Sequence, residues 1–187
     1  MARLVHLNGP PGIGKSTLSA LLADRNPGTL NLDVDTLHRL VGGWQDERTD
    51  TWPAVWALVR AMAATHLDGG HDVVLPQYCA DAEEIRGFAE LAREHGAGFR
   101  EIVLLDDRAA AIDRFGHRAR DSDDPWIRHH HRLVERDGGS VVLGTMYDNL
   151  IEAVRRLPGA AVVPSAAGAV AQTYELLTQA LREPPRG

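Results

Sequence analysis

The segment Gly9–Ser16 has the residue types and the spacing of a phosphate-binding loop. It fits the pattern G-x-x-x-x-G-K-[ST] at every required position, between an apolar run and a helical one. Glycines let the backbone fold tightly, so successive N–H groups point inward at an anion, and the following helix adds its positive N-terminal end. The residues predicted to contact phosphates are Gly9, Gly12, Ile13, Gly14, Lys15, Ser16 and Thr17.

Lys15 is the only lysine among the 20 basic residues of the chain. Arginine replaces lysine everywhere else, so this exception indicates a position that needs a compact ammonium group. We expect Lys15 to reach the outer phosphates and the Ser16 hydroxyl to hold Mg²⁺. A glycine turn before an ordinary helix is the alternative.

Two carboxylates, Asp33 and Asp35, follow the apolar run 29–32. Residues two apart point the same way along an extended chain, so we expect both at the carboxyl edge of a parallel sheet, where ligands bind. One could support Mg²⁺, for which we favour Asp33, and the other could accept a proton from an attacking hydroxyl, for which we favour Asp35. The assignment of the two roles stays open, as does helix capping by Asp35 with Asp33 solvated.

Apolar runs and helical spacing alternate along the chain. Short apolar runs predict strands at 3–8, 29–32, 72–76, 100–105 and 160–163. Three- and four-residue spacing predicts helices at 15–24, 37–41, 51–67, 81–95, 107–118, 126–136, 141–157 and 169–181, with a loop at 119–125. This alternation predicts an α/β fold: one domain over residues 1–187, with a five-stranded parallel sheet and helices on both faces.

Composition excludes several classes of protein. The net charge is -6 and no basic run follows a phosphate backbone, so we expect no nucleic-acid partner. No apolar stretch is long enough for a membrane span or a signal peptide, so we expect a cytoplasmic protein. The single cysteine, Cys79, excludes an internal disulfide and a thiolate zinc site. A single lysine also excludes the Asn-Lys-x-Asp element of guanine-reading switches. The oligomeric state stays open.

These motifs resemble the small P-loop kinases related to nucleoside monophosphate, shikimate and gluconate kinases, and among them chloramphenicol phosphotransferase and the tunicamycin-resistance proteins. The resemblance implies transfer of the γ-phosphoryl group of ATP, with Mg²⁺, to a small molecule. Lys15 and Ser16 match the phosphate and magnesium residues of the family, and Asp35 matches its base. The chain departs from the family where the strand 72–76 ends in Pro76 and Gln77 without a carboxylate.

The segment 113–120 resembles the lid of these kinases, which we place at about 114–136. The resemblance implies that Arg114 contacts the adenine base and that Arg118 or Arg120 contacts the phosphates, with Arg118 favoured for catalysis. Each of these arginines could instead lie on a solvated helix face. Among His129, His130 and His131, one could meet the substrate, although consecutive helix positions diverge too far to share a metal ion.

The acceptor site is predicted from aromatic residues that follow Asp35. Trp44, Trp52 and Trp56 could form an apolar wall for the acceptor, although Trp52 and Trp56 could also pack in the core. Further substrate-binding candidates are Arg39, Gln77 and Tyr78. Basic residues are few here, which favours an antibiotic or a nucleoside-like compound over a sugar acid.

We therefore expect a kinase with a small-molecule alcohol as acceptor. The alternative is a nucleotide-dependent protein that sequesters a ligand without phosphoryl transfer. A polynucleotide end kinase is disfavoured by the acidic net charge.

Overall fold

The structure, a computed structural model, describes residues 1–120 and 122–183, apart from the side chains of residues 119 and 120. Five parallel strands form one sheet in the order β2-β3-β1-β4-β5. The strands are β1 (Arg3–Asn8), β2 (Leu30–Asn31), β3 (Val73–Pro76), β4 (Gly98–Leu105) and β5 (Ala161–Pro164). The predicted α/β class and the parallel sheet are confirmed.

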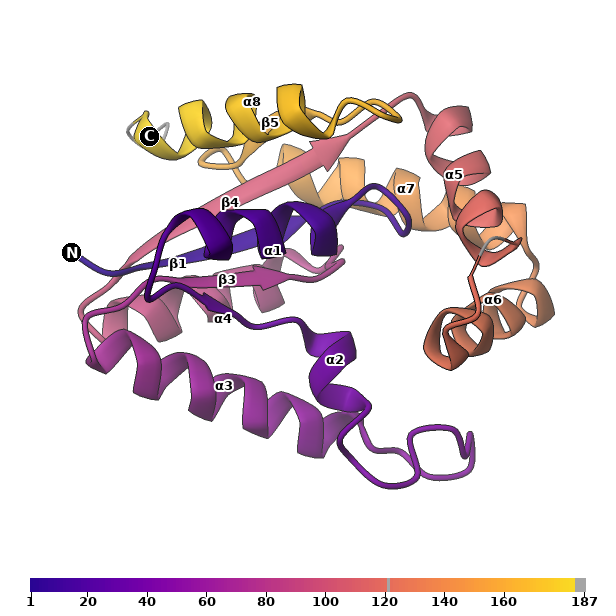
Figure 1. The fold of residues 1–187 in the computed structure, drawn as a ribbon, viewed down its shortest axis with the longest axis horizontal. Coiled ribbons are helices and arrows are strands. Elements are labelled where there is room, and N and C mark those ends of the chain that lie inside the picture. The colour runs from indigo at the N-terminus through magenta and orange to yellow at the C-terminus, as the bar shows by residue number, and fades with distance from the viewer. Residues whose placement is uncertain (121, 184–187) are drawn as a thin grey trace.

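Helices cover both faces of the sheet, because the central strands bury side chains on both sides (Figure 1). On one face, α1 (Lys15–Arg25) and α8 (Val170–Arg182) enclose a core that includes Leu7, Leu18 and Leu177. On the other face, α3 (Trp52–Asp68) and α4 (Ala82–Glu94) enclose a core around Leu4, Val59 and Phe88. Two cores of this kind hold the strands at fixed positions beneath the helices.

The remaining helices lie toward the carboxyl ends of the strands, at the same end of the molecule as the loop between β1 and α1 (Figure 1). They are α2 (Val34–His38), α5 (Arg108–Arg120), α6 (Pro125–Arg136) and α7 (Ser140–Arg155). In the described part of the chain, every helix falls short of the length and apolar character that a membrane span needs.

Most predicted element boundaries differ from the observed ones by one to three residues, and two of these differences have a clear physical cause. The helix predicted to reach Val41 ends at His38, and the chain continues in tighter turns in which the N–H groups of Leu40 and Val41 donate to carbonyls three residues back. The helix predicted to begin at Trp126 begins at Pro125, because Asp124 caps it and proline suits the first helical position.

Gly9 directly follows β1. Its backbone conformation and the close approach of β4 exclude any residue with a side chain. Its φ is +148°, and a Cβ atom there would lie 2.7 Å from the backbone oxygen of Leu104 in β4. Gly87 in α4 is different, because a Cβ atom there would meet nothing within 4 Å.

Gly9→Ala is therefore expected to lower the free energy of unfolding by about 1–3 kcal/mol, because it combines backbone strain with a clash. Gly87→Ala is the matched control, and it should raise stability by about 0.5–1 kcal/mol. Urea unfolding of both variants measures the difference. Equal stability of Gly9→Ala and the wild type would contradict the close approach of β1 and β4.

Candidate active site

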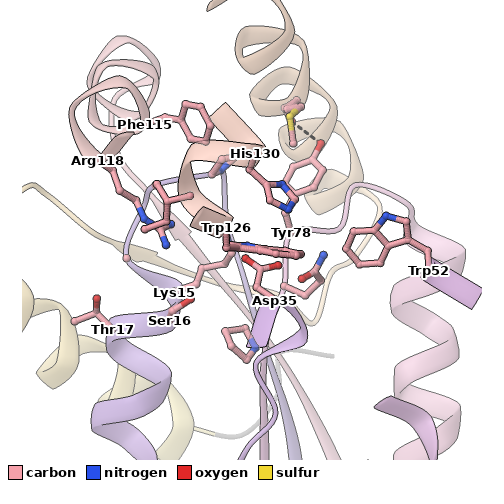
Figure 2. Close-up of a pocket in the computed structure, with 17 residues that line it drawn as sticks. Lys15, Ser16, Thr17, Asp35, Trp52, Tyr78, Phe115, Arg118, Trp126 and His130 are labelled. Carbon is pink, nitrogen blue, oxygen red and sulfur yellow. Dashed lines mark hydrogen bonds between the residues drawn. The ribbon is translucent and has the colours of Figure 1, made fainter. Parts of the chain in front are cut away.

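A cavity of about 350 Å³ opens at the carboxyl edge of the sheet (Figure 2). The loop before α1, the helices α2 and α3, the segment after β3, and the helices α5 to α7 all contribute to it. Its lining residues are Pro11, Gly12, Gly14, Lys15, Ser16, Thr17, Asp35, Trp52, Pro76, Gln77, Tyr78, Phe115, Arg118, Trp126, Ile127, His130 and Met146. The structure thus gathers residues from distant parts of the chain around one space.

The glycine loop forms one end of this cavity. Gly14, with φ +108°, precedes α1, and no described side chain caps the helix there, so the first N–H groups of α1 are available to an anion. The Nζ atom of Lys15 donates to the backbone oxygens of Gly9 (2.8 Å) and Pro10 (3.1 Å). Burial, together with the charge of Arg118, lowers the pKa of Lys15 to about 8, despite the raising effects of Asp35 and Asp33.

Arg118 brings a second cation to the same end from α5. Its exposed side chain lines the cavity, and within residues 1–120 and 122–183 no carboxylate pairs with it. Its charge lowers the pKa of both Lys15 and Asp35, so the three groups lie close together. Two cations therefore face the glycine loop.

Asp35 lies in the first turn of α2 and lines the cavity near Lys15 and Arg118. Burial raises the pKa of Asp35, and so does the charge of Asp33; the nearby indole of Trp126 and the charges of Lys15 and Arg118 lower it. Asp33 caps α2, since its Oδ1 accepts from the N–H of Thr36 at 3.1 Å. The expectation that the pair extends a strand is wrong, because β2 already ends at Asn31.

Aromatic side chains form the other end of the cavity. In Figure 2, Trp126 lies over Asp35, with Tyr78, His130 and Trp52 around them. The hydroxyl of Tyr78 donates to the backbone oxygen of Met146 at 3.0 Å, so its ring is held against α7. Gln77 faces the cavity with no partner for its side-chain amide in the described part of the chain.

A buried polar network joins the two ends of the cavity beneath its floor. Asn8, with no exposed surface, accepts from the N–H groups of Gly9 (2.8 Å) and Cys79 (3.0 Å) and donates to the backbone oxygen of Cys79 (2.8 Å) and to Glu101 (3.0 Å). His6 contacts Glu101 at 2.6 Å and the backbone oxygen of Gln77 at 3.0 Å. The glycine loop and the segment 77–79 are therefore fixed relative to each other.

Several predicted site residues lie outside the cavity lining. Gly9 and Ile13 are buried beneath the loop, and Arg39 pairs with Asp124 at 3.0 Å. Trp56 packs on Phe88, with ring centroids 5.9 Å apart, as the core-packing alternative has it. Asp33 does not line the cavity either.

Arg114 was expected to contact the adenine base of the nucleotide, but its side chain is bound by other parts of the protein. Its guanidinium donates to the backbone oxygens of Ser165 and Ile13 and lies 3.3 Å from Asp106, so it binds α5 to the back of the glycine loop. The side chain of Arg120 lies outside the described residues.

Trp126 lines the cavity but was not among the predicted site residues. Asp124 followed by Pro125 is a helix-start signal, which places Trp126 and His130 one turn apart on the same face of α6. The three consecutive histidines diverge as expected: His129 packs on Trp44, His130 lines the cavity, and His131 stacks on Phe115. The helix-start signal could be read from the sequence. The sequence did not show which elements this face of α6 packs against.

Comparison with known proteins identifies the fold. Residues 4–136 match a family model described as an AAA domain, whereas no curated protein sequence matches significantly. A gluconokinase from Sinorhizobium meliloti 1021 is similar in structure, with 20% identity and a TM-score of 0.62 over 97% of this chain and 91% of that chain. A tunicamycin resistance protein from Deinococcus radiodurans is similar with 16% identity and a TM-score of 0.56 over 96% of this chain and 95% of that chain.

A chain of the Pnkp1/Rnl/Hen1 RNA repair complex is also similar, with 14% identity and a TM-score of 0.65 over 83% of this chain and 46% of that chain. At these identities the likeness shows the fold alone, which is that of the small P-loop kinases.

His130 predicts a pH dependence of stability. Burial, together with the charges of His129, His38 and Arg118, lowers its pKa to about 4, whereas an unfolded histidine titrates near 6.5. Between these values the unfolded chain binds the proton more tightly, so stability is full above about pH 6.5 and falls as the pH drops toward 4.

His130→Gln should therefore lose less stability than the wild type between pH 7 and pH 5, as measured by urea unfolding at each pH. The other titrating groups remain in both proteins, so their effects cancel in the comparison. Parallel pH profiles would contradict a neutral, buried His130.

Proposed function

We propose that this chain, which belongs to the AAA domain family and has the fold of small P-loop kinases, transfers the γ-phosphoryl group of ATP to a hydroxyl of a small molecule. One observation carries the proposal. A single cavity brings Lys15, Ser16 and Arg118 together with Asp35, and Asp35 lies among aromatic side chains that include Trp126 and Tyr78. Phosphoryl transfer needs cations where charge develops and a base beside the acceptor.

The glycine-loop end suits the phosphates of ATP. Lys15 already donates to two backbone oxygens of its own loop, and phosphate oxygens would offer it stronger, charged acceptors. Thr17 and the first N–H groups of α1 face the same space. Arg118, on a helix of the candidate lid at about 114–136, would contact the phosphoryl group from the opposite side.

The donors beside Lys15 also suit Mg²⁺. Magnesium takes oxygen ligands and usually binds through one or two protein groups plus phosphates and water. The Ser16 hydroxyl lines the cavity. Asp33 lies outside the lining, but its charge raises the pKa of Lys15, so it is nearby, and only one of its oxygens is used in capping α2. These two residues would hold the ion. Bound there, Mg²⁺ would neutralise charge on the β- and γ-phosphates.

Asp35 is the proposed base. It would accept the proton of the acceptor hydroxyl while that oxygen forms a bond to the γ-phosphorus and the bond from phosphorus to the β–γ bridging oxygen breaks, releasing ADP. Lys15 and Arg118 would stabilise the charge on the transferring oxygens. Burial raises the pKa of Asp35 toward the range in which a carboxylate can act as a base.

The aromatic end supports a neutral acceptor with an apolar body and one exposed hydroxyl, such as an antibiotic or a nucleoside-like compound. Trp52, Trp126 and Tyr78 provide flat apolar surface, and Gln77 provides an amide for one polar group. The cations of the described lining are Lys15 and Arg118, which the phosphates of ATP would occupy, and the low pKa of His130 leaves that imidazole neutral. With both cations bound to phosphates, none would remain for the carboxylate of a sugar acid.

The test of this function is a panel of hydroxylated acceptors, including antibiotics, nucleosides and sugar acids, incubated with ATP and Mg²⁺ and analysed by mass spectrometry. We expect ADP together with a phosphorylated acceptor. Lys15→Ala should fold and lower the rate at least about a hundredfold, because a fixed charge at the transition state is lost. Asp35→Asn should abolish transfer and keep ATP affinity, because the base contacts only the acceptor.

Near-normal turnover by folded Lys15→Ala would contradict the assignment. Ligand binding without any phosphorylated product would instead support the sequestering alternative.

Trp52 and Trp56 form a matched pair for testing the acceptor wall. Trp52→Leu should raise the KM of the acceptor about tenfold and leave that of ATP unchanged, because one aromatic contact is worth about 1 kcal/mol or more. Trp56→Leu should mainly lower thermal stability, since Trp56 packs on Phe88. Similar effects of the two variants on the acceptor KM would remove Trp52 from the site.

A further inference from the structure

A second cavity, of about 340 Å³, lies at the end of the sheet opposite the candidate active site. Its described lining includes Arg3 and Val73, the first residues of β1 and β3, whereas the candidate active site lies beyond the last residues of these strands. The last residues of α1 and α8, Arg25 and Arg182, also line it. In Figure 1 this is the end of the molecule where β1 begins, away from α5 and α6. Phosphoryl transfer in the candidate active site makes no use of this space.

Arginine provides most of the charge in this second cavity. The charged side chains of its described lining are Arg3, Arg25, Arg182 and Asp72. The carboxylate of Asp72 is already engaged, because it accepts from the backbone N–H of Arg3 at 2.8 Å and from the guanidinium of Arg3 at 3.2 Å and 2.7 Å. Within residues 1–120 and 122–183, no carboxylate pairs with Arg25 or Arg182. Two positive charges of this lining are therefore uncompensated, in a chain whose net charge is -6.

Stabilisation of the helix ends is the competing explanation for Arg25 and Arg182. Each lies in the last turn of its helix, where the negative end of the helix dipole favours a cation. Other side chains, however, already donate to backbone oxygens there: the amide of Asn26 to an oxygen of α1, and the guanidinium of Arg100 to two oxygens at the end of α8. Neither Arg25 nor Arg182 donates to a backbone oxygen in the described part of the chain. Their N–H groups are therefore available to a ligand.

Arg25 is held in place by an aromatic ring of the lining. Its Cζ atom lies 4.6 Å from the centroid of the Tyr174 ring, and Tyr174 is itself buried, with 7% of its surface exposed. A guanidinium that stacks on a ring uses its face and keeps its N–H donors, which lie in the plane of the group. The hydroxyls of Tyr174 and Thr29, from the same lining, have no hydrogen-bond partner among the described residues. The cavity thus combines an ordered guanidinium with two hydroxyl donors.

We propose that this cavity is a second binding site, for a phosphate ester of a small molecule. A phosphomonoester carries a charge of about -2, which matches the two uncompensated arginines, and guanidinium groups pair with phosphate oxygens through two parallel hydrogen bonds. The buried side chains of Leu22 and Val74 line the same space and would contact the organic part of the ester. The volume of the cavity lies in the range of sites that take small molecules.

A ligand in this cavity would not displace ATP from the glycine loop. Lys15 begins α1 and Arg25 ends it, so these two residues are about 15 Å apart along the helix axis, at a rise of about 1.5 Å per residue. The two cavities share no described lining residue. The second site therefore does not depend on the proposed function, and its ligand should bind while nucleotide fills the glycine loop.

The experiment is isothermal titration calorimetry of the full chain with glucose 6-phosphate, AMP, inorganic phosphate and, as the neutral control, glucose. A non-hydrolysable ATP analogue and Mg²⁺ fill the glycine loop, and salt at about 0.15 M screens weak attraction between exposed charges. At least one of the two esters should bind, inorganic phosphate should bind more weakly, and glucose should not bind. Absence of ester binding, or binding of inorganic phosphate or glucose as tight as that of the esters, would overturn the proposal.

Arg93→Gln is the matched control for Arg25→Gln and Arg182→Gln. Arg93 is also an exposed arginine in the last turn of a helix, with no carboxylate partner among the described residues, but it lines neither cavity. Arg25→Gln and Arg182→Gln should each weaken ester binding at least about tenfold, the effect of losing a hydrogen bond between charged groups. Arg93→Gln should keep the wild-type affinity. Equal affinities of all three variants, once thermal unfolding has shown that they are folded, would overturn the proposal.

Backbone amide signals of ¹⁵N-labelled wild-type protein locate the ester without any variant. Glucose 6-phosphate should shift the signals of Arg25, Asn26 and Thr29 and leave those of Gly14 and Ser16 unchanged. Shifts confined to Gly14 and Ser16 would place the ester in the candidate active site and overturn the second site, while the proposed function would stand.

Discussion

Asn8, the last residue of β1, hydrogen-bonds to the glycine loop through Gly9 and to the segment after β3 through both backbone groups of Cys79. Glu101 and His6 complete this network from β4 and β1, and all three side chains are buried. A buried polar group without a partner costs about 1–3 kcal/mol, so each member depends on the others. The distance between the phosphate end and the acceptor end of the cavity is therefore fixed by the interior of the sheet rather than by its loops.

The charged groups of the cavity above that network influence one another's pKa values. Lys15 and Arg118 lower the pKa of Asp35, while Asp35 and Asp33 raise that of Lys15, so each group favours the charged form of the opposite one. Burial acts against both charges, which explains why the pKa of Lys15 falls to about 8 despite two neighbouring carboxylates. An arriving phosphate would add negative charge beside Lys15 and favour its protonated form.

The sequence predicted the sheet and the glycine loop well, because both depend on local patterns: apolar runs for the strands and the loop motif before α1. Predictions from the sequence were less successful for side chains whose positions depend on long-range contacts. Arg114 was expected to contact the adenine base, but it donates to the backbone oxygens of Ser165 and Ile13. Trp52 and Trp56 looked equivalent, and both pack against the same core, but only Trp52 also lines the cavity. Trp126 could not be linked to Asp35, since the contact joins helices far apart in sequence.

The most direct test of phosphoryl transfer in this cavity is a crystal structure with ADP, Mg²⁺ and aluminium fluoride, which imitates the transferring phosphoryl group. We expect the fluoride on the side of the cavity that faces Asp35, within hydrogen-bonding distance of Lys15 and Arg118. The Nζ atom of Lys15 should then have left the backbone oxygens of Gly9 and Pro10. Nucleotide bound away from the glycine loop, or Lys15 still bound to those oxygens, would contradict the account.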